Sequence, residues 1–337
     1  MLDLDAFEAN LARMAARTAQ TGKALRPHAK AHKCPEISRR QVAAGAVGVC
    51  VATLAEAELM AAAGMPSLLV TSPVADPLKM ARLVATGAMV VVDHPVQVDL
   101  YQKAAHAAGR ITDVLVDLDV GDHRTGARPD DVLAIAQTID RSPNLHLHGI
   151  QAYSVLGSHN GGFDGRKKVS TEALALAAHV FSDLQAAGLP VEVLTGGSTG
   201  TWDIDTEIAA LTELQAGSYV LMDMAYRREG LDFRRAMTVL ATVVSANHPG
   251  FVTIDSGTKS FSTDRGYGPQ AVAYPEAASR WGGDEFCYLE GPNLPKLGEK
   301  LELIPPHCDP TANLYDRIHA CRGDEVEAIW PLKRLVL

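Results

Sequence analysis

The sequence has few cysteines and no long hydrophobic run. Its five cysteines, Cys34, Cys50, Cys287, Cys308 and Cys321, are odd in number, irregularly spaced and contain no C-x-x-C pair. This pattern suggests neither a disulfide framework nor a zinc knuckle, and it fits a reducing cytoplasm. No apolar run is long enough to span a bilayer, and no signal-peptide pattern opens the chain. We therefore expect a cytoplasmic protein without a membrane partner.

An excess of positive charge is also missing. The 337 residues carry 40 acidic and 31 basic side chains, which gives a formal net charge of −9. Binding to nucleic acid requires a basic face, so we expect no nucleic acid as main partner. What the chain does have is 47% hydrophobic residues and a length that suits a barrel followed by a smaller domain.

Short β-branched runs alternate with helical patterns from Leu2 to about Tyr226. Polar breaks and glycines bound the runs, and Thr53–Ala63 begins with a capping box and ends before Gly64. The alternation predicts a (β/α)8 barrel, with a doubly wound sheet as the alternative. The eight predicted strands are Ala24–Lys30, Val47–Ala52, Ser67–Thr71, Met89–Asp93, Asp113–Val120, Leu147–Tyr153, Val191–Thr195 and Leu214–Leu221.

The sequence of this region also predicts a further strand and several helices. Leu2–Leu4 is a shortened strand, and Asp5 is expected to cap the helix that follows it. Longer helices are predicted at Pro95–Ala108 and Glu172–Ala187.

The pattern of residues along the sequence changes after about Asp232. Short strand-like runs are separated there by glycine, proline and aspartate, which predicts a second, mostly β domain. The predicted organisation is a barrel over residues 5–230 and a β domain over 231–337, with residues 1–4 as a strand that pairs with the second domain. The predicted strands of the second domain are Thr238–Val244, Phe251–Ile254, Lys300–Ile304 and Glu325–Trp330.

A basic run, Arg26–Lys33, follows the apolar pair Ala24-Leu25 and precedes the predicted start of a helix. Cationic neighbours and partial burial both lower an ammonium pKa, so Lys30 is a candidate nucleophile at the end of the first strand. The alternative is a solvated basic turn, which is the more common fate of an isolated basic run.

Polar residues interrupt the apolar pattern where other strands end, as expected for a barrel whose function gathers at that face. Tyr153 ends a predicted strand, Arg124 and the glycine-rich turn 196–200 follow predicted strands, and His159 lies in a loop beyond Tyr153. The turn lacks a P-loop lysine and dinucleotide spacing, although its backbone N–H groups could approach a phosphate. Taken singly, a plain loop explains the turn at least as well. An isolated arginine such as Arg124 is more often a surface salt-bridge partner, and a lone tyrosine such as Tyr153 is more often a core aromatic residue.

Pro305–Pro310 is the distinctive motif of the second domain. Its prolines favour an extended segment, in which His307 and Asp309 would share a face and Cys308 would point away. An imidazole and a carboxylate together suit a divalent metal with open positions. A turn begun by Asp309-Pro310 is the alternative.

Taken together, five motifs in one order resemble the D-threonine aldolase / D-serine dehydratase family, on its aldolase side. The motifs are Arg26–Lys33, Gln151–Tyr153, Thr195–Gly200, Leu214–Tyr219 and His307–Asp316. The family consists of fold-type III pyridoxal 5'-phosphate (PLP) enzymes related to alanine racemase. The resemblance implies an alanine racemase-like barrel, a C-terminal β domain and a homodimer.

The resemblance also implies residue roles. Lys30 resembles the Schiff-base lysine, Arg124 the arginine at the cofactor's phenolic oxygen, and Tyr153 the tyrosine beside the cofactor. His159 falls where the aldolases carry a histidine near the substrate hydroxyl, and Gln215 where alanine racemase has an arginine facing the pyridine nitrogen. The implied phosphate cradle consists of Thr195, Gly196, Gly197, Gly217, Ser218 and Tyr219.

His307 and Asp309 resemble the metal ligands of the family. The D-serine dehydratases usually have a cysteine at the second position, which suits zinc. The carboxylate of Asp309 favours Mn²⁺ or Mg²⁺, with Zn²⁺ as a further possibility.

The implied reaction is retro-aldol cleavage of D-β-hydroxy amino acids to glycine and an aldehyde, dependent on PLP and a divalent metal. One alternative is a D-serine or 3-hydroxyaspartate dehydratase that uses the same site, and another is a non-catalytic PLP carrier. Two features depart from the family pattern. Members usually have residues before the Leu2–Leu4 strand, and the loop Ser154–Ser158 differs from that of the aldolases.

Overall fold

The computed structural model describes residues 1–334, which divide into two compact units. The barrel unit comprises Arg13–Lys30 and Pro35–Gly217, and the β unit comprises Met1–Ala12, Ala31–Cys34 and Ser218–Arg334. Helix α1 (Leu4–Thr21) contributes residues to both units. The boundaries inferred from the sequence, 5–230 and 231–337, stay a prediction.

Eight parallel strands form the barrel unit's sheet, in the order β2-β9-β8-β7-β6-β5-β4-β3. The sheet closes because Leu25 and Pro27 accept backbone hydrogen bonds from Val47 and Cys50, beside a bridge between His28 and Cys50. The predicted (β/α)8 barrel is therefore confirmed, and the doubly wound alternative is wrong. The strands are β2 (Ala24–Leu25), β3 (Val49–Val51), β4 (Leu68–Val70), β5 (Met89–Val92), β6 (Thr112–Asp117), β7 (Leu145–Ala152), β8 (Val193–Gly196) and β9 (Glu213–Leu214).

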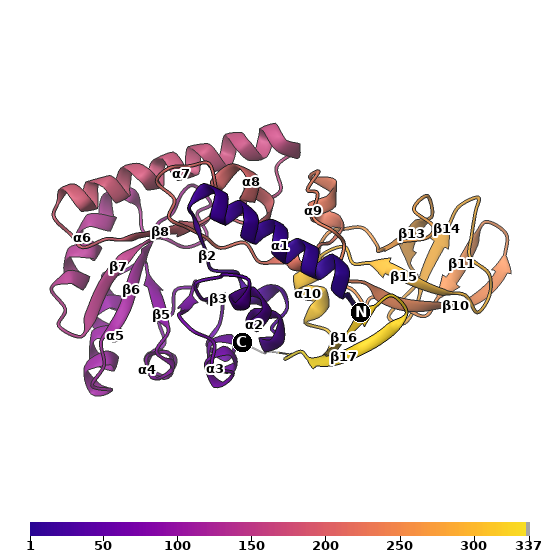
Figure 1. The fold of residues 1–337 in the computed structure, drawn as a ribbon, viewed down its shortest axis with the longest axis horizontal. Coiled ribbons are helices and arrows are strands. Elements are labelled where there is room, and N and C mark those ends of the chain that lie inside the picture. Colours follow the sequence, from indigo (N-terminus) through magenta and orange to yellow (C-terminus); the bar gives the residue numbers. More distant parts are fainter. Residues whose placement is uncertain (335–337) are drawn as a thin grey trace. The chain divides into compact units, whose positions relative to one another are not determined.

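Helices separate the strands, and α3 to α7 contact one another in sequence around the outside of the sheet (Figure 1). Local signals set their starts: Thr53 accepts a hydrogen bond from Glu56 N at 3.3 Å, and Asp76 and His94 precede a proline at the first helical position. The helices are α2 (Pro35–Ala43), α3 (Leu54–Ala62), α4 (Pro77–Thr86), α5 (Pro95–Ala107), α6 (Pro129–Asp140), α7 (Gly162–Ala186) and α8 (Trp202–Asp205), with 3₁₀ turns η1 (Ala29–Ala31) and η2 (Thr199–Thr201).

Several predicted element boundaries are wrong. The first strand ends at Leu25 rather than Lys30, because Pro27 cannot donate to a ladder and the chain turns into η1. The eighth ends at Leu214 and is followed by a 3₁₀ turn rather than strand. Asp3, not Asp5, caps α1, since its side chain accepts a hydrogen bond from Ala6 N at 3.0 Å. Helix α7 begins at Gly162, ten residues before the predicted start at Glu172. It therefore includes Gly162 and Gly165, two of the glycines that precede the predicted helix.

The β unit is built on a six-stranded antiparallel sheet in the order β12-β15-β10-β11-β14-β13. A second sheet joins β1 (Leu2–Asp3), β16 (Arg317–Arg322) and β17 (Glu325–Pro331), with β1 parallel to β16. The other elements are η3 (Ser218–Val220), α9 (Met224–Arg228), α10 (Cys308–Ala312), β10 (Val239–His248), β11 (Phe251–Ile254), β12 (Gln270–Ala271), β13 (Ala278–Trp281), β14 (Cys287–Glu290) and β15 (Lys300–Ile304). The C-terminal, mostly β domain expected from the sequence is thus confirmed. Across residues 1–334, no helix is both long and apolar enough to cross a membrane.

Candidate active site

A cavity of about 120 Å³ in the barrel unit holds the predicted site residues of the strand ends. Lys30 enters it from η1, Arg124 from the loop after β6, and Tyr153 from the residue that follows β7. The Lys30 ammonium lies 5.8 Å and the Arg124 guanidinium carbon 5.2 Å from the centre of the Tyr153 ring. Two cations beside one aromatic ring suit a ligand that is both planar and anionic.

A buried chain of amides and carboxyls adjoins this cavity. Gln215 donates to Gln151 Oε1 at 3.2 Å and to Thr195 Oγ1 at 3.1 Å, and Gln151 donates to Asp117 Oδ1 at 2.8 Å. Burial raises the pKa of Asp117 to about 6, although the bonds from Gln151 and Thr125 favour its charged form. The network fixes the Gln215 amide, which lines the cavity and presents no formal charge to it.

Arg26, the first residue of the basic run, belongs to the same network rather than to the cavity. Its guanidinium forms two hydrogen bonds with the Glu213 carboxylate, at 2.9 and 2.8 Å, and both side chains are buried. Glu213 also accepts from Thr195 Oγ1 at 2.9 Å. The predicted phosphate ligand Thr195 is therefore held by a buried ion pair, which is a positioning role for Arg26.

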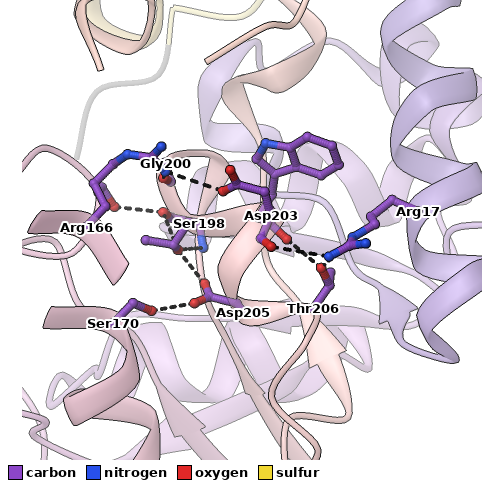
Figure 2. Close-up of polar contacts among 11 residues, drawn as sticks. Arg17, Arg166, Ser170, Ser198, Gly200, Asp203, Asp205 and Thr206 are labelled. Carbon is purple, nitrogen blue, oxygen red and sulfur yellow. Dashed lines mark hydrogen bonds and ion pairs between the residues drawn. The ribbon is translucent and has the colours of Figure 1, made fainter. Parts of the chain in front are cut away.

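Asp205 holds the glycine-rich turn after β8 in place through hydrogen bonds (Figure 2). The buried Asp205 carboxyl accepts hydrogen bonds from the hydroxyls of Ser170 and Thr201 and from the backbone N–H of Ser198. Burial raises the pKa of Asp205 to about 7, against the effect of these donors. Ser198 is further bonded through its hydroxyl to Ser158 at 2.8 Å. None of these anchors was identified from the sequence, where no periodic signal marks them.

Glycine is required at the turn itself. Gly197 has φ +72°, and a Cβ there would lie 2.5 Å from Asp205 Oδ2. A Cβ on Gly217 would lie 2.5 Å from the backbone oxygen of His28. Close packing against protein atoms therefore accounts for both glycines, and phosphate binding by the backbone N–H groups of 196–197 and 217 stays a prediction.

Of the predicted cofactor-site residues, only Lys30, Arg124, Tyr153 and Gln215 line the cavity, and the predicted phosphate ligands Thr195, Gly196, Gly197 and Gly217 do not. His159 lies half-buried in the loop that follows Tyr153. Ser218 and Tyr219 belong to η3 of the β unit, where Ser218 donates to Asp309 Oδ1 at 2.8 Å and the Tyr219 ring lies 5.6 Å from that of Phe233. The prediction that Gly217–Tyr219 continue the eighth strand is wrong, because the chain turns into η3.

His307 and Asp309 lie at the start of α10, so the extended segment predicted for them is wrong. His307 is the N-cap residue, with an extended backbone, whereas Asp309 is in the first helical turn and Cys308 is fully buried. The Cys308 N–H donates to Asp223 Oδ2 at 2.8 Å, which anchors the turn, and burial raises the pKa of Asp223.

The donor set nevertheless fits a divalent metal. His307 Nδ1 is 2.8 Å from Asp264 Oδ2, and a carboxylate at one ring nitrogen orients the other nitrogen of a metal-binding histidine. Asp309 adds a carboxylate that Ser218 holds by a hydrogen bond. Sequence reasoning missed Asp264 and Asp223, which lie in loops and turns far from the motif along the chain.

Two protein families match the chain in order. The family described as Alanine racemase, N-terminal domain matches residues 2–225, and the one described as Putative serine dehydratase domain matches residues 236–321.

Curated relatives match over nearly the whole chain. A D-threonine aldolase of Arthrobacter sp is 38% identical, with 98% of this chain and 90% of that protein covered. A 3-hydroxy-D-aspartate aldolase of Paracoccus denitrificans (strain Pd 1222) is 34% identical at the same coverage. A D-threo-3-hydroxyaspartate dehydratase of Delftia sp. (strain HT23) is 30% identical, with 98% and 95% covered.

The crystal structure of a D-threonine aldolase from Filomicrobium marinum has the same fold. The two chains superpose with a TM-score of 0.95 at 37% identity, over 98% of this chain and 93% of that one. Family matches to more than half of the chain, identity above 30% over almost its full length and this superposition agree with the motifs. The chain belongs to the D-threonine aldolase / D-serine dehydratase family of alanine racemase-like, fold-type III PLP enzymes.

Proposed function

We propose that this protein is a PLP- and divalent-metal-dependent lyase that cleaves D-β-hydroxy amino acids of the D-threonine type to glycine and an aldehyde. The observation that carries the proposal is the barrel cavity in which Lys30 and Arg124 flank Tyr153, in a chain 38% identical to a D-threonine aldolase. When bound, PLP supplies an electron sink for the breaking Cα–Cβ bond, and the divalent ion supplies a Lewis acid that lowers the pKa of the substrate hydroxyl.

The barrel unit's residues hold the cofactor. The Lys30 amine would attach it covalently, Tyr153 would pack beside its ring and Arg124 would bind its phenolic oxygen. Thr195, Gly196, Gly197 and Gly217 would hold its phosphate, in or beside the turn that Asp205 fixes. Gln215 would offer its pyridine nitrogen a neutral amide, whose orientation the bonds to Gln151 and Thr195 determine.

The β unit's residues hold the metal. His307 and Asp309 are the proposed ligands, with Mn²⁺ or Mg²⁺ favoured by the hard carboxylate, and Asp264 orients the imidazole. His159 removes the proton from the substrate β-hydroxyl, directly or through a water molecule. The roles of Ser218 and Tyr219 in phosphate binding stay predictions, and Ser218 has a second role in holding Asp309.

A dehydratase with the same cofactors is the competing function, supported by the 30% identity to the D-threo-3-hydroxyaspartate dehydratase. In that reaction Lys30 would take the Cα proton while the β-hydroxyl leaves. The aldolase is favoured because identity to the two aldolases is higher, at 38% and 34%. A non-catalytic PLP carrier is disfavoured by the β unit and its metal-ligand pair.

The test is product analysis with purified full-length protein. D-threonine should give glycine and acetaldehyde. Turnover of D-3-hydroxyaspartate shows whether the enzyme accepts a carboxylate at the β-carbon. D-serine tests for dehydration. Pyruvate and ammonia from D-serine, with no glycine from D-threonine, would refute the aldolase assignment. Chelation should abolish turnover and Mn²⁺ should restore it.

Two variants separate the cofactors. Lys30→Ala should lose the visible absorption of bound PLP, whereas Asp309→Ala should keep that absorption and lose turnover. Lys33→Ala is the matched control, because it removes a neighbouring ammonium from the same basic run. Turnover that survives Asp309→Ala would contradict the metal role.

We further propose that the protein acts as a homodimer in the cytoplasm on a small D-amino acid. Sedimentation of the holoenzyme at micromolar concentration tests the first point, since a monomeric active species would contradict it.

A further inference from the structure

We propose that Asp113, His146 and His148 form a second metal site, which binds Zn²⁺ and is separate from the His307/Asp309 pair. Each of the three offers one ligand atom, and these atoms lie within 4.8 Å of one another. No other trio of histidine, cysteine or acidic residues in residues 1–334 meets this condition.

The strand registers of the barrel unit create the site. His146 and His148 are two residues apart on β7, beside an irregularity in its register with β6. Both are partly exposed, while Leu145, Leu147 and Gly149 are buried. Asp113 on β6 is the register partner of His146. Side chains at paired positions of neighbouring strands lie close together, so the register brings a carboxylate to the two imidazoles.

Contacts within the trio leave room for an ion. His146 Nδ1 is 2.8 Å from Asp113 Oδ1, and both side chains are 47% exposed. The ring centres of His146 and His148 are 5.9 Å apart. His148 Nδ1 is buried and has no hydrogen-bond partner among residues 1–334. A buried polar atom without a partner is costly, and an ion bound at this nitrogen would reduce that cost.

Two imidazoles and one carboxylate form a donor set that first-row transition metals bind well. Zn²⁺ commonly takes three protein ligands and a water molecule in a tetrahedral arrangement. Tetrahedral bonds of about 2.0–2.1 Å place ligand atoms about 3.3 Å apart. The exposed side chains of Asp113 and His146 can make this adjustment by rotation.

The site lies away from the proposed chemistry. It is at the first residues of β6 and β7, whereas the cavity with Lys30 and Tyr153 lies beyond the other ends of the barrel strands. Bound Zn²⁺ would join two neighbouring strands and raise the thermal stability of the folded chain, because an ion that binds only the native state stabilises it. Turnover should not depend on it.

The experiment is equilibrium dialysis of chelator-treated, full-length protein against Zn²⁺. The variant His146→Ala/His148→Ala should bind one equivalent less than the wild type, and Zn²⁺ should raise its melting temperature less. The matched control is His179→Ala, since His179 also faces a carboxylate, Asp183 at 3.4 Å, on an exposed surface but has no third ligand. Equal zinc content in the double variant and the wild type would overturn the proposal, as would an equal loss in His179→Ala.

Two further variants keep the test decisive. Asp113→Asn is isosteric and exposed, so it covers the case in which the double alanine variant does not fold, and it should weaken binding of that equivalent at least tenfold. Unchanged affinity in a folded Asp113→Asn protein would also overturn the proposal. Asp309→Ala should retain the equivalent, and its loss there would assign the zinc to the other pair. These measurements of zinc binding need no substrate, so their outcome does not depend on the aldolase assay.

Discussion

Replacement of Asp205 by alanine should destabilise the barrel unit far more than the same change at Asp203, two residues earlier on α8. Asp205 is fully buried and accepts from two hydroxyls, Ser170 and Thr201, and from the backbone N–H of Ser198. Each buried donor that loses its acceptor costs about 1–3 kcal/mol, so three donors at the lower limit give a loss of about 3 kcal/mol.

Asp203 provides the matched comparison. Its carboxylate is 3.4 Å from the Arg166 guanidinium, and its side chain is 32% exposed. Arg166 is buried, but it keeps its hydrogen bond to the Gly200 carbonyl when this long contact is lost. Asp203→Ala should therefore reduce the free energy of unfolding by less than Asp205→Ala does.

The assay is urea denaturation of both variants and the wild type, combined with titration of the apoprotein with PLP. Because Asp205 fixes Ser198 and Thr201, Asp205→Ala should also weaken PLP binding, whereas Asp203→Ala should not. If the two variants unfold at the same urea concentration and bind PLP equally, the anchoring role argued for Asp205 is wrong.

The pH dependence of stability gives an independent measure of the same group. The pKa of Asp205 rises from 3.8 to about 7 on burial, so the folded state holds this proton more tightly than the unfolded state. Its contribution is complete below about pH 4 and is lost as the pH rises through about 7. Asp205→Asn has no such proton. The difference in unfolding free energy between the wild type and Asp205→Asn should therefore shrink from pH 4 to pH 8, and a constant difference would contradict the raised pKa.

Two further substitutions test residues that support the cavity, Arg26 and Gly217. Arg26→Met leaves the buried Glu213 carboxylate without its ion pair and should cost about 3–5 kcal/mol in urea denaturation, against about 0–1 kcal/mol for Arg82→Met, which breaks an exposed pair. Gly217→Ala places a Cβ 2.5 Å from a backbone oxygen and should weaken PLP binding, whereas Gly157→Ala, whose Cβ meets only ordinary contacts at 3.5 Å or more, should not.

The barrel could be predicted from the sequence because each element carries its own local signal. Runs such as Met89–Val92 are continuous and apolar, as buried parallel strands are, and glycines and caps bound the helices between them. The predictions failed where tertiary contacts decide the outcome. Ala24–Lys30 and Leu214–Leu221 look like whole strands, yet both turn into 3₁₀ helix within a few residues of Leu25 and Leu214.

Four of the residues that line the cavity could be predicted for a related reason. Lys30, Arg124, Tyr153 and Gln215 each follow a strand, and closure of the barrel brings all such positions to one face. Their supports were not predictable in the same way. Asp205 on α8 accepts hydrogen bonds from Ser198 and Thr201 at the glycine-rich turn and from Ser170 on α7, and no motif in either helix marks these contacts.

The two proposed metal sites show which metal ligands can be predicted from residue spacing along the chain. His307 and Asp309 were paired by the alternation of an extended segment, but the chain is helical at Asp309, so their pairing depends on the family motif and on Asp264 rather than on alternation. For His146 and His148, exposed and buried residues alternate along β7, although its register with β6 is irregular at His148. Even there the third ligand comes from the register between β6 and β7, which a single sequence does not specify. Metal sites built across strands therefore require the sheet register before their ligands can be identified.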